Sequence, residues 1–234
     1  MIFFFKKCLE FFIFLILFIL VSSSVYYYSG LYKNFVVSKS IYKVIDKSKT
    51  KHSAKLLLIG DSVAEQLFDP NNKESHEINS LACSYSVSSL GVYILLNNYL
   101  KANNNISDVV YLMGPNSFQN NLDLPWTYNY FLKPFFKTDN YVYFDDYSKD
   151  LIKNMEFSEF SQTIPFLITN WSPDYQYPKL NNNHFLSNIS IFYLRKIKNL
   201  LKLNNIKFHI ISPPISEYKN SQLNNLVNEY YEKD

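Results

Sequence analysis

The sequence predicts an α/β domain with a mainly parallel sheet, preceded by one membrane-spanning helix. Short apolar runs that end in turn-forming residues alternate with longer stretches that carry a helical apolar stripe, and this alternation is typical of parallel strands joined by crossover helices. An uncharged N-terminal segment stands outside that pattern. Hydrophobic residues make up 47% of the chain and charged residues 18%, which excludes a disordered polyelectrolyte.

The N-terminal segment predicts a membrane crossing. Residues 11–32 carry no charge, and about 20 apolar residues suffice to cross a bilayer core. Lys6 and Lys7 precede the segment, which favours a cytoplasmic N-terminus, and residues 26–28 are tyrosines suited to the far interface. Serines at 22–24 follow a short apolar core, so a cleaved signal peptide is the alternative. Both interpretations place the domain outside the cytoplasm.

These patterns divide the chain into parts. We expect a cytoplasmic end at 1–10, a transmembrane helix or uncleaved signal anchor at 11–30, a polar stalk at 31–53 and the α/β domain at 54–234. Strands are predicted at 55–59, 77–82, 108–113 and 207–211, and helices at 63–68, 87–102, 184–204 and 222–232.

An aromatic-rich insertion is expected at about 117–180. Loops of this length are usually functional and carry short helices of their own. The aromatic run within it either packs the insertion onto the core or lines an acyl or sugar pocket; it comprises Trp126, Tyr128, Tyr130, Phe131, Phe135 and Phe136.

A candidate site follows the first and third strands. Ser62 lies just after the first strand, in the turn Gly60-Asp61-Ser62, and ligand sites of open α/β sheets lie beyond the carboxyl ends of strands. The structural alternative is that Ser62 is a helix N-cap. The third strand runs into Gly114-Pro115-Asn116-Ser117. We expect the two turns to face each other, with the Asn116 amide as an oxyanion donor.

These two turns resemble the sequence blocks of the SGNH (GDSL) hydrolase family. The resemblance covers roughly residues 54–216, with Ser117 where the family has Asp. It implies a flavodoxin-like three-layer α/β/α domain and a serine esterase, lipase or O-acyltransferase with Ser62 as nucleophile. Asn116 and the Ser62 amide would form part of the oxyanion hole. The family's second block supplies a glycine amide; here the candidate backbone N–H groups are those of Ala82, Cys83 and Ser84.

The family's closing Asp-x-x-His block, which supplies the base, does not occur in this sequence. Each of the four histidines is more typical of a structural or solvated residue: His52, His76, His184 and His209. The chain stops at residue 234, apparently within its last helix. We therefore expect an incomplete chain whose missing tail holds the base.

Charge and residue spacing argue against a nucleic-acid partner and against a bound metal. A net charge of +3 without a dense basic patch argues against nucleic acid. Cys8 and Cys83 lack metal-like spacing, and the acidic residues Asp145, Asp146 and Asp150 are typical of a solvated loop, so we expect neither metal nor other cofactor.

Three functions remain as hypotheses. The first is a membrane-anchored enzyme that adds or removes acyl groups on cell-surface glycan or a similar lipid-like substrate. The second is a non-catalytic domain that binds or scaffolds surface polysaccharide machinery, and the third is a secreted lipase or esterase. The sequence does not indicate an oligomeric state.

Overall fold

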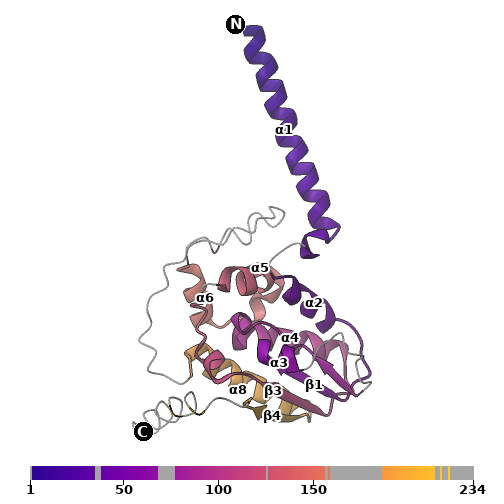
Figure 1. Cartoon of the computed structure of the whole chain (residues 1–234), viewed down its shortest axis with the longest axis vertical. Coiled ribbons are helices and arrows are strands. Elements are labelled where there is room, and N and C mark those ends of the chain that lie inside the picture. Colours follow the sequence, from indigo (N-terminus) through magenta and orange to yellow (C-terminus); the bar gives the residue numbers. More distant parts are fainter. Residues whose placement is uncertain are drawn as a thin grey trace.

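The domain is built on a four-stranded, all-parallel sheet, which confirms the expected α/β class. The computed structural model describes residues 2–34, 38–67, 77–124, 126–155, 158, 186–213, 217 and 221. The strands are β1 (Leu56–Gly60), β2 (Ile78–Ser80), β3 (Asp108–Leu112) and β4 (Lys207–Ile211). Their order is β2-β1-β3-β4, so β1 and β3 are central and neighbours (Figure 1).

One face of the sheet carries the main core. Leu57 and Ile59 of β1 and Val109 and Tyr111 of β3 are buried on this face. The long helices α4 (Ser88–Ala102) and α8 (Asn188–Leu203) pack against each other and complete the core. The alternating burial of β3 follows from the two-residue period of a strand, which sends successive side chains to opposite faces.

The opposite face carries a smaller apolar cluster. Leu58, with Val110 and Leu112, packs against Ala64 of the short helix α3 (Ser62–Leu67). Parallel sheets are normally covered on both faces. In the described part of the chain, this second face is covered by much less helix than the first.

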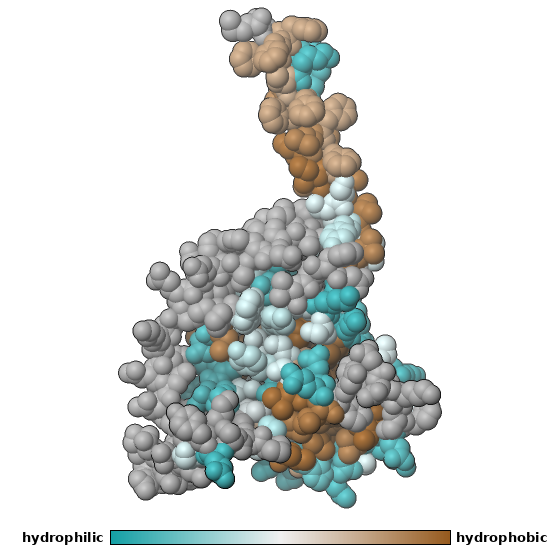
Figure 2. Space-filling view, in the orientation of Figure 1, coloured by the Kyte–Doolittle hydropathy of each residue, from teal (hydrophilic) through white to brown (hydrophobic). Residues whose placement is uncertain are grey.

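The N-terminal helix α1 (Ile2–Tyr28) is long and apolar enough to cross a membrane, although a signal sequence has the same character. Its candidate span, Phe3–Tyr28, has a mean hydropathy of 2.5 and is not buried in the domain. Figure 2 shows it as a largely hydrophobic rod beyond the domain. Gly30 caps the end of the helix: its φ of +73° is left-handed, and its N–H donates a hydrogen bond to the Tyr27 carbonyl at 3.0 Å.

The segment expected to be a stalk instead contributes to the core. It contains the short helix η1 (Leu31–Asn34) and the helix α2 (Lys39–Ser48), which packs against α4. Ile41 is fully buried, and Val44 and Ile45 pack against the same core. These apolar residues recur at helical spacing on one face, a signal that the many lysines of the segment obscure.

The expectation of short helices after residue 117 is confirmed as far as residue 155. These helices are η3 (Pro115–Gln119), η4 (Tyr128–Leu132), α5 (Lys133–Phe135), η5 (Thr138–Tyr143) and α6 (Asp146–Lys153). Another short helix, η2 (Tyr85–Val87), lies earlier in the chain, directly before α4. The aromatic run mostly packs the core, because Tyr128, Phe131, Phe135 and Phe136 are buried whereas Trp126 is half exposed. Most of residues 156–185, and the helix predicted at 222–232, lie outside the described residues.

Candidate functional site

Gly60 sets the geometry of the turn that carries Ser62. Its φ of +157° lies outside the range of ordinary residues, and a Cβ added there would lie 1.8 Å from the Leu112 carbonyl oxygen and 2.8 Å from Ala64 Cβ. Gly60 pairs with Leu112 in the β1–β3 register. Only glycine therefore lets β1 end in close contact with β3 and α3, at the carboxyl edge of the sheet.

Asp61 joins the turn after β1 to the turn after β3. Its side chain is buried, and Oδ1 accepts a hydrogen bond from the Val63 amide at 2.9 Å. Oδ2 accepts from the Gly114 amide at 2.8 Å and from Ser117 Oγ at 2.5 Å. Three donated hydrogen bonds offset the free-energy cost of removing this buried carboxylate from water. The two turns thus meet through Asp61.

Ser117 is a site residue whose role the sequence does not reveal. It is buried and holds the Asp61 carboxylate from the β3 side. Ser117 directly follows Asn116, in a turn that has the same relation to β3 as the Asp61 turn has to β1. This shared position is the sequence signal that could have suggested a contact between Ser117 and Asp61. Ser117 therefore gives Asp61 a neutral donor from the turn after β3.

The Ser62 hydroxyl is not used in local structure. Ser62 is half-buried at the start of α3, and Asp61, not Ser62, accepts the hydrogen bond that an N-cap residue accepts. Asn116 is exposed in η3. Within the described part of the chain, neither the Ser62 hydroxyl nor the Asn116 amide makes a hydrogen bond. Both polar groups follow strand ends at the same edge of the sheet.

The expectation for Ala82 needs correction. Its amide donates to Ser80 Oγ at 3.2 Å, and the Cys83 amide donates to the Gly60 carbonyl at 3.1 Å, so both N–H groups are already used. Of the three candidate amides, that of Ser84 makes no hydrogen bond to any described residue. The Cys83 thiol is inert, because burial, followed by the nearby Glu65 and Asp61 carboxylates, raises its pKa.

The described histidines lie away from Ser62. His52 precedes β1, where its Nε2 is 2.7 Å from Thr50 Oγ1 and its ring stacks on Tyr99. His209 Nε2 is 3.0 Å from Oδ1 of Asp108, the first residue of β3. Both contacts are at the amino edge of the sheet, whereas Ser62 follows the carboxyl end of β1. His76 and His184 lie outside the described residues.

Glu65 is a second residue of the candidate site that the sequence analysis does not include. It is half-buried one helical turn after Ser62, so the two side chains are neighbours on α3. Its carboxyl group makes no hydrogen bond or ion pair with a described residue, and burial raises its pKa. The Ser-x-x-Glu spacing would have identified it, although this spacing is also typical of helix capping.

A metal centre has no support in the described residues, where no group of three or more His, Cys, Asp or Glu side chains is placed to hold an ion. No family model, curated protein or solved structure matches this chain. The chemistry of the site is therefore argued from the geometry of this chain alone.

Proposed function

We propose that this protein is a membrane-anchored serine esterase or O-acyltransferase of the SGNH type, which acts outside the cytoplasm on acylated cell-surface glycan or a similar lipid-like substrate. One observation carries the proposal. The Asp61 carboxylate fixes the turns after β1 and β3 to each other, and at that edge the Ser62 hydroxyl and the Asn116 amide make no hydrogen bond to a described residue.

The strand order supports the same proposal. The order β2-β1-β3-β4 corresponds to the first four strands of a flavodoxin-like sheet, in which ligands bind at the switch point between β1 and β3. Ser62 follows β1 and Asn116 follows β3, so the two residues flank this switch point. A three-layer domain, with further helix on the α3 face, completes the proposed fold.

The proposed reaction is acyl transfer through Ser62. Ser62 Oγ attacks the acyl carbonyl carbon and loses its proton to a base, while the Asn116 side-chain amide and the Ser62 backbone amide stabilise the oxyanion. The intermediate then expels the alcohol, which takes up a proton. Water releases the acyl group in an esterase, and a sugar hydroxyl receives it in a transferase.

Glu65 is the candidate proton acceptor within the described residues. Its raised pKa makes it a better base than an ordinary glutamate, because a useful catalytic pKa lies close to the operating pH. A histidine from outside the described residues is the alternative base. The variant Glu65→Gln separates the two, because only the first alternative predicts that it slows acylation of Ser62.

Labelling with a fluorophosphonate probe tests the nucleophile. The full chain should form one covalent adduct, mapped by peptide mass spectrometry to the peptide containing Ser62, and Ser62→Ala should abolish it. Ser53→Ala is the matched control, since Ser53 is an exposed serine before β1. Labelling that survives Ser62→Ala would refute the assignment.

A non-catalytic SGNH-like domain is the second candidate function, and the position of the described histidines favours it. Neither His52 nor His209 lies near Ser62, and triad members act as a unit, so a serine without its base loses most of its reactivity. Folded protein that resists the probe, yet binds acylated polysaccharide equally well with and without Ser62→Ala, would select this binding function.

A secreted lipase or esterase differs from the proposal only in the fate of α1, which also has the character of a signal sequence. The mass of the mature protein distinguishes the two. A chain that keeps α1 and fractionates with membranes supports the anchor. A chain that begins after residue 24 and is released supports secretion.

A further inference from the structure

The positive charge of the protein is concentrated between α1 and β1. Residues 29–51 contain six lysines and one aspartate, whereas the chain after residue 51 contains fifteen basic and eighteen acidic side chains. The domain as a whole is therefore basic next to α1 and net acidic elsewhere. Such an asymmetry indicates a local anionic partner rather than a general property of the surface.

Helix α2 and the residues directly after it present these lysines to solvent. Because Ile41 and its apolar neighbours pack against the core, Lys39 and Lys43, one turn apart, are exposed, as are Lys49 and Lys51. The side chains of these four lysines make no hydrogen bond or ion pair with a described residue. We call them the α2 lysine face.

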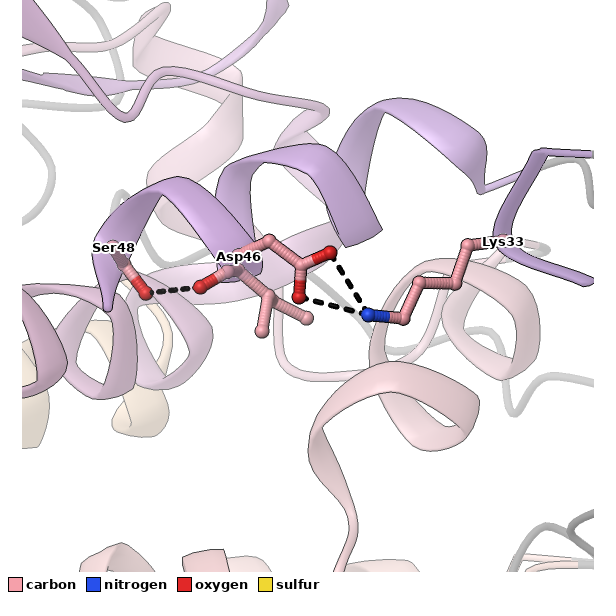
Figure 3. Close-up of polar contacts among 4 residues, drawn as sticks. Lys33, Asp46 and Ser48 are labelled. Atoms are coloured by element: carbon pink, nitrogen blue, oxygen red, sulfur yellow. Dashed lines mark hydrogen bonds and ion pairs between the residues drawn. The ribbon is translucent and has the colours of Figure 1, made fainter. Parts of the chain in front are cut away.

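The acidic residue of this segment is neutralised by a different lysine. Lys33 Nζ of η1 is 2.8 Å from both carboxylate oxygens of Asp46, the aspartate of α2 (Figure 3). Ser48 Oγ, at the end of the same helix, donates to the Ile45 carbonyl at 2.7 Å. The ion pair offsets the charge of Asp46, which is the one acidic residue of segment 29–51, and it links α2 to η1.

This link keeps the α2 lysine face close to the end of α1. Helix η1 begins directly after the Gly30 cap and contacts both α1 and α2. Lys33 is five residues beyond Tyr28, which even in a fully extended chain is no more than about 18 Å. Tyrosines such as Tyr28 locate the end of a spanning helix at the membrane interface. Figure 1 shows α2 at the end of the domain from which α1 emerges.

We propose that the α2 lysine face binds the anionic phospholipid headgroups of the membrane that α1 spans, and so docks the domain on the bilayer surface. The proposal rests only on the membrane anchor of the proposed function, and it depends neither on the side of the membrane that the domain faces nor on the chemistry of Ser62. Juxtamembrane lysines are attracted to anionic headgroups within a Debye length, about 8 Å at physiological salt. Docking would hold the edge of the sheet at a defined height above the membrane.

Chemical footprinting of the lysines in the full chain tests this docking. The protein is reconstituted in nanodiscs of phosphatidylcholine alone, or with about 30% phosphatidylglycerol, and treated with a small amine-acylating reagent. We expect the α2 lysine face to react about fivefold more slowly in the anionic discs. Lys198 and Lys202, exposed on α8, should react equally in both, and the difference should disappear at about 0.5 M salt.

A charge-matched pair of variants provides the second measurement, by hydrogen exchange of the α2 backbone. The first replaces Lys39, Lys43, Lys49 and Lys51 with Gln and should lose the protection that anionic lipid confers. The control replaces Lys153, Lys198, Lys202 and Lys207 with Gln and should keep it. Both remove four charges from exposed residues.

Three results would overturn the docking. Equal reaction rates in the two kinds of disc would exclude anionic headgroups as the partner. Protection that is independent of lipid and rises with protein concentration would assign the α2 lysine face to a second copy of the chain. If the intact chain did not remain with the discs, α1 would not be a membrane anchor and the docking proposal would fail with it. Probe labelling of Ser62 in detergent would still test the acyl chemistry separately.

Discussion

Replacing Asp61 by Asn should destabilise the domain through a loss that the hydrogen bonds define. Asn keeps one oxygen, which still accepts from the Val63 amide. The other oxygen becomes an NH2 group, which cannot accept from the Gly114 amide or from Ser117 Oγ. The Gly114 amide is left without its acceptor, and a reversed bond from the new NH2 group to Ser117 Oγ no longer involves a charge. At about 1.5 kcal/mol for each charged hydrogen bond removed, the free energy of unfolding should fall by up to about 3 kcal/mol.

Urea unfolding of the full chain in mild detergent, followed by the near-ultraviolet signal of the buried tyrosines, measures this loss. Asp139→Asn is the matched control, because Asp139 is exposed and the same replacement should change stability by less than about 0.5 kcal/mol. Ser117→Ala should cost less than Asp61→Asn, since two donors remain on the carboxylate. Equal stabilities of Asp61→Asn and Asp139→Asn would refute the structural role of the carboxylate.

Three further predictions concern stability. Gly60→Ala should cost about 4 kcal/mol in urea unfolding through overpacking and strain against Leu112, whereas Gly30→Ala, with open space around it, should cost about 1 kcal/mol. Ile41→Ala should lower the free energy of unfolding by at least about 2 kcal/mol, because Ile41 of α2 is fully buried in the core. A loss under about 0.5 kcal/mol would instead support a stalk that does not pack on the domain. Glu65→Gln should stabilise the protein at pH 7, because ionising a half-buried carboxyl with a raised pKa opposes folding. This gain should vanish in unfolding measurements below pH 4.5, the ordinary pKa, where the group is protonated in both states.

Three of the four strands could be predicted from the sequence because each contains a short, mainly apolar run, as in β1 and β3. The predicted bounds of β1, β3 and β4 agree with the structure to within one residue. Strand β2 ends at Ser80, two residues earlier than predicted. The Leu81 and Cys83 amides still donate to the Leu58 and Gly60 carbonyls of β1, whereas the Ala82 amide donates to Ser80 Oγ. The sequence of α2 predicts a stalk because lysines separate its apolar residues along the chain, although in the helix Lys39 and Lys43 lie on the opposite face from Ile41.

The site was only partly predictable, since its main contact joins distant parts of the chain. Ser62 and Asn116 could be proposed from the ends of two strands. The acceptor role of Asp61 could not, because its partners Gly114 and Ser117 come from a turn more than 50 residues away. The contact depends on the parallel register that places Gly60 opposite Leu112, and no local pattern specifies that register.

An acyl-enzyme on Ser62 is the most direct test of the proposed chemistry. The full chain in detergent is mixed with an activated acetyl ester, quenched in acid and weighed by intact-protein mass spectrometry. We predict a gain of one acetyl group that fragmentation places on Ser62, slower formation in Asp61→Asn and none in Ser62→Ala. Folded protein that gains no acetyl group, or gains it equally with Ser62→Ala, would contradict the assignment of Ser62 as a nucleophile.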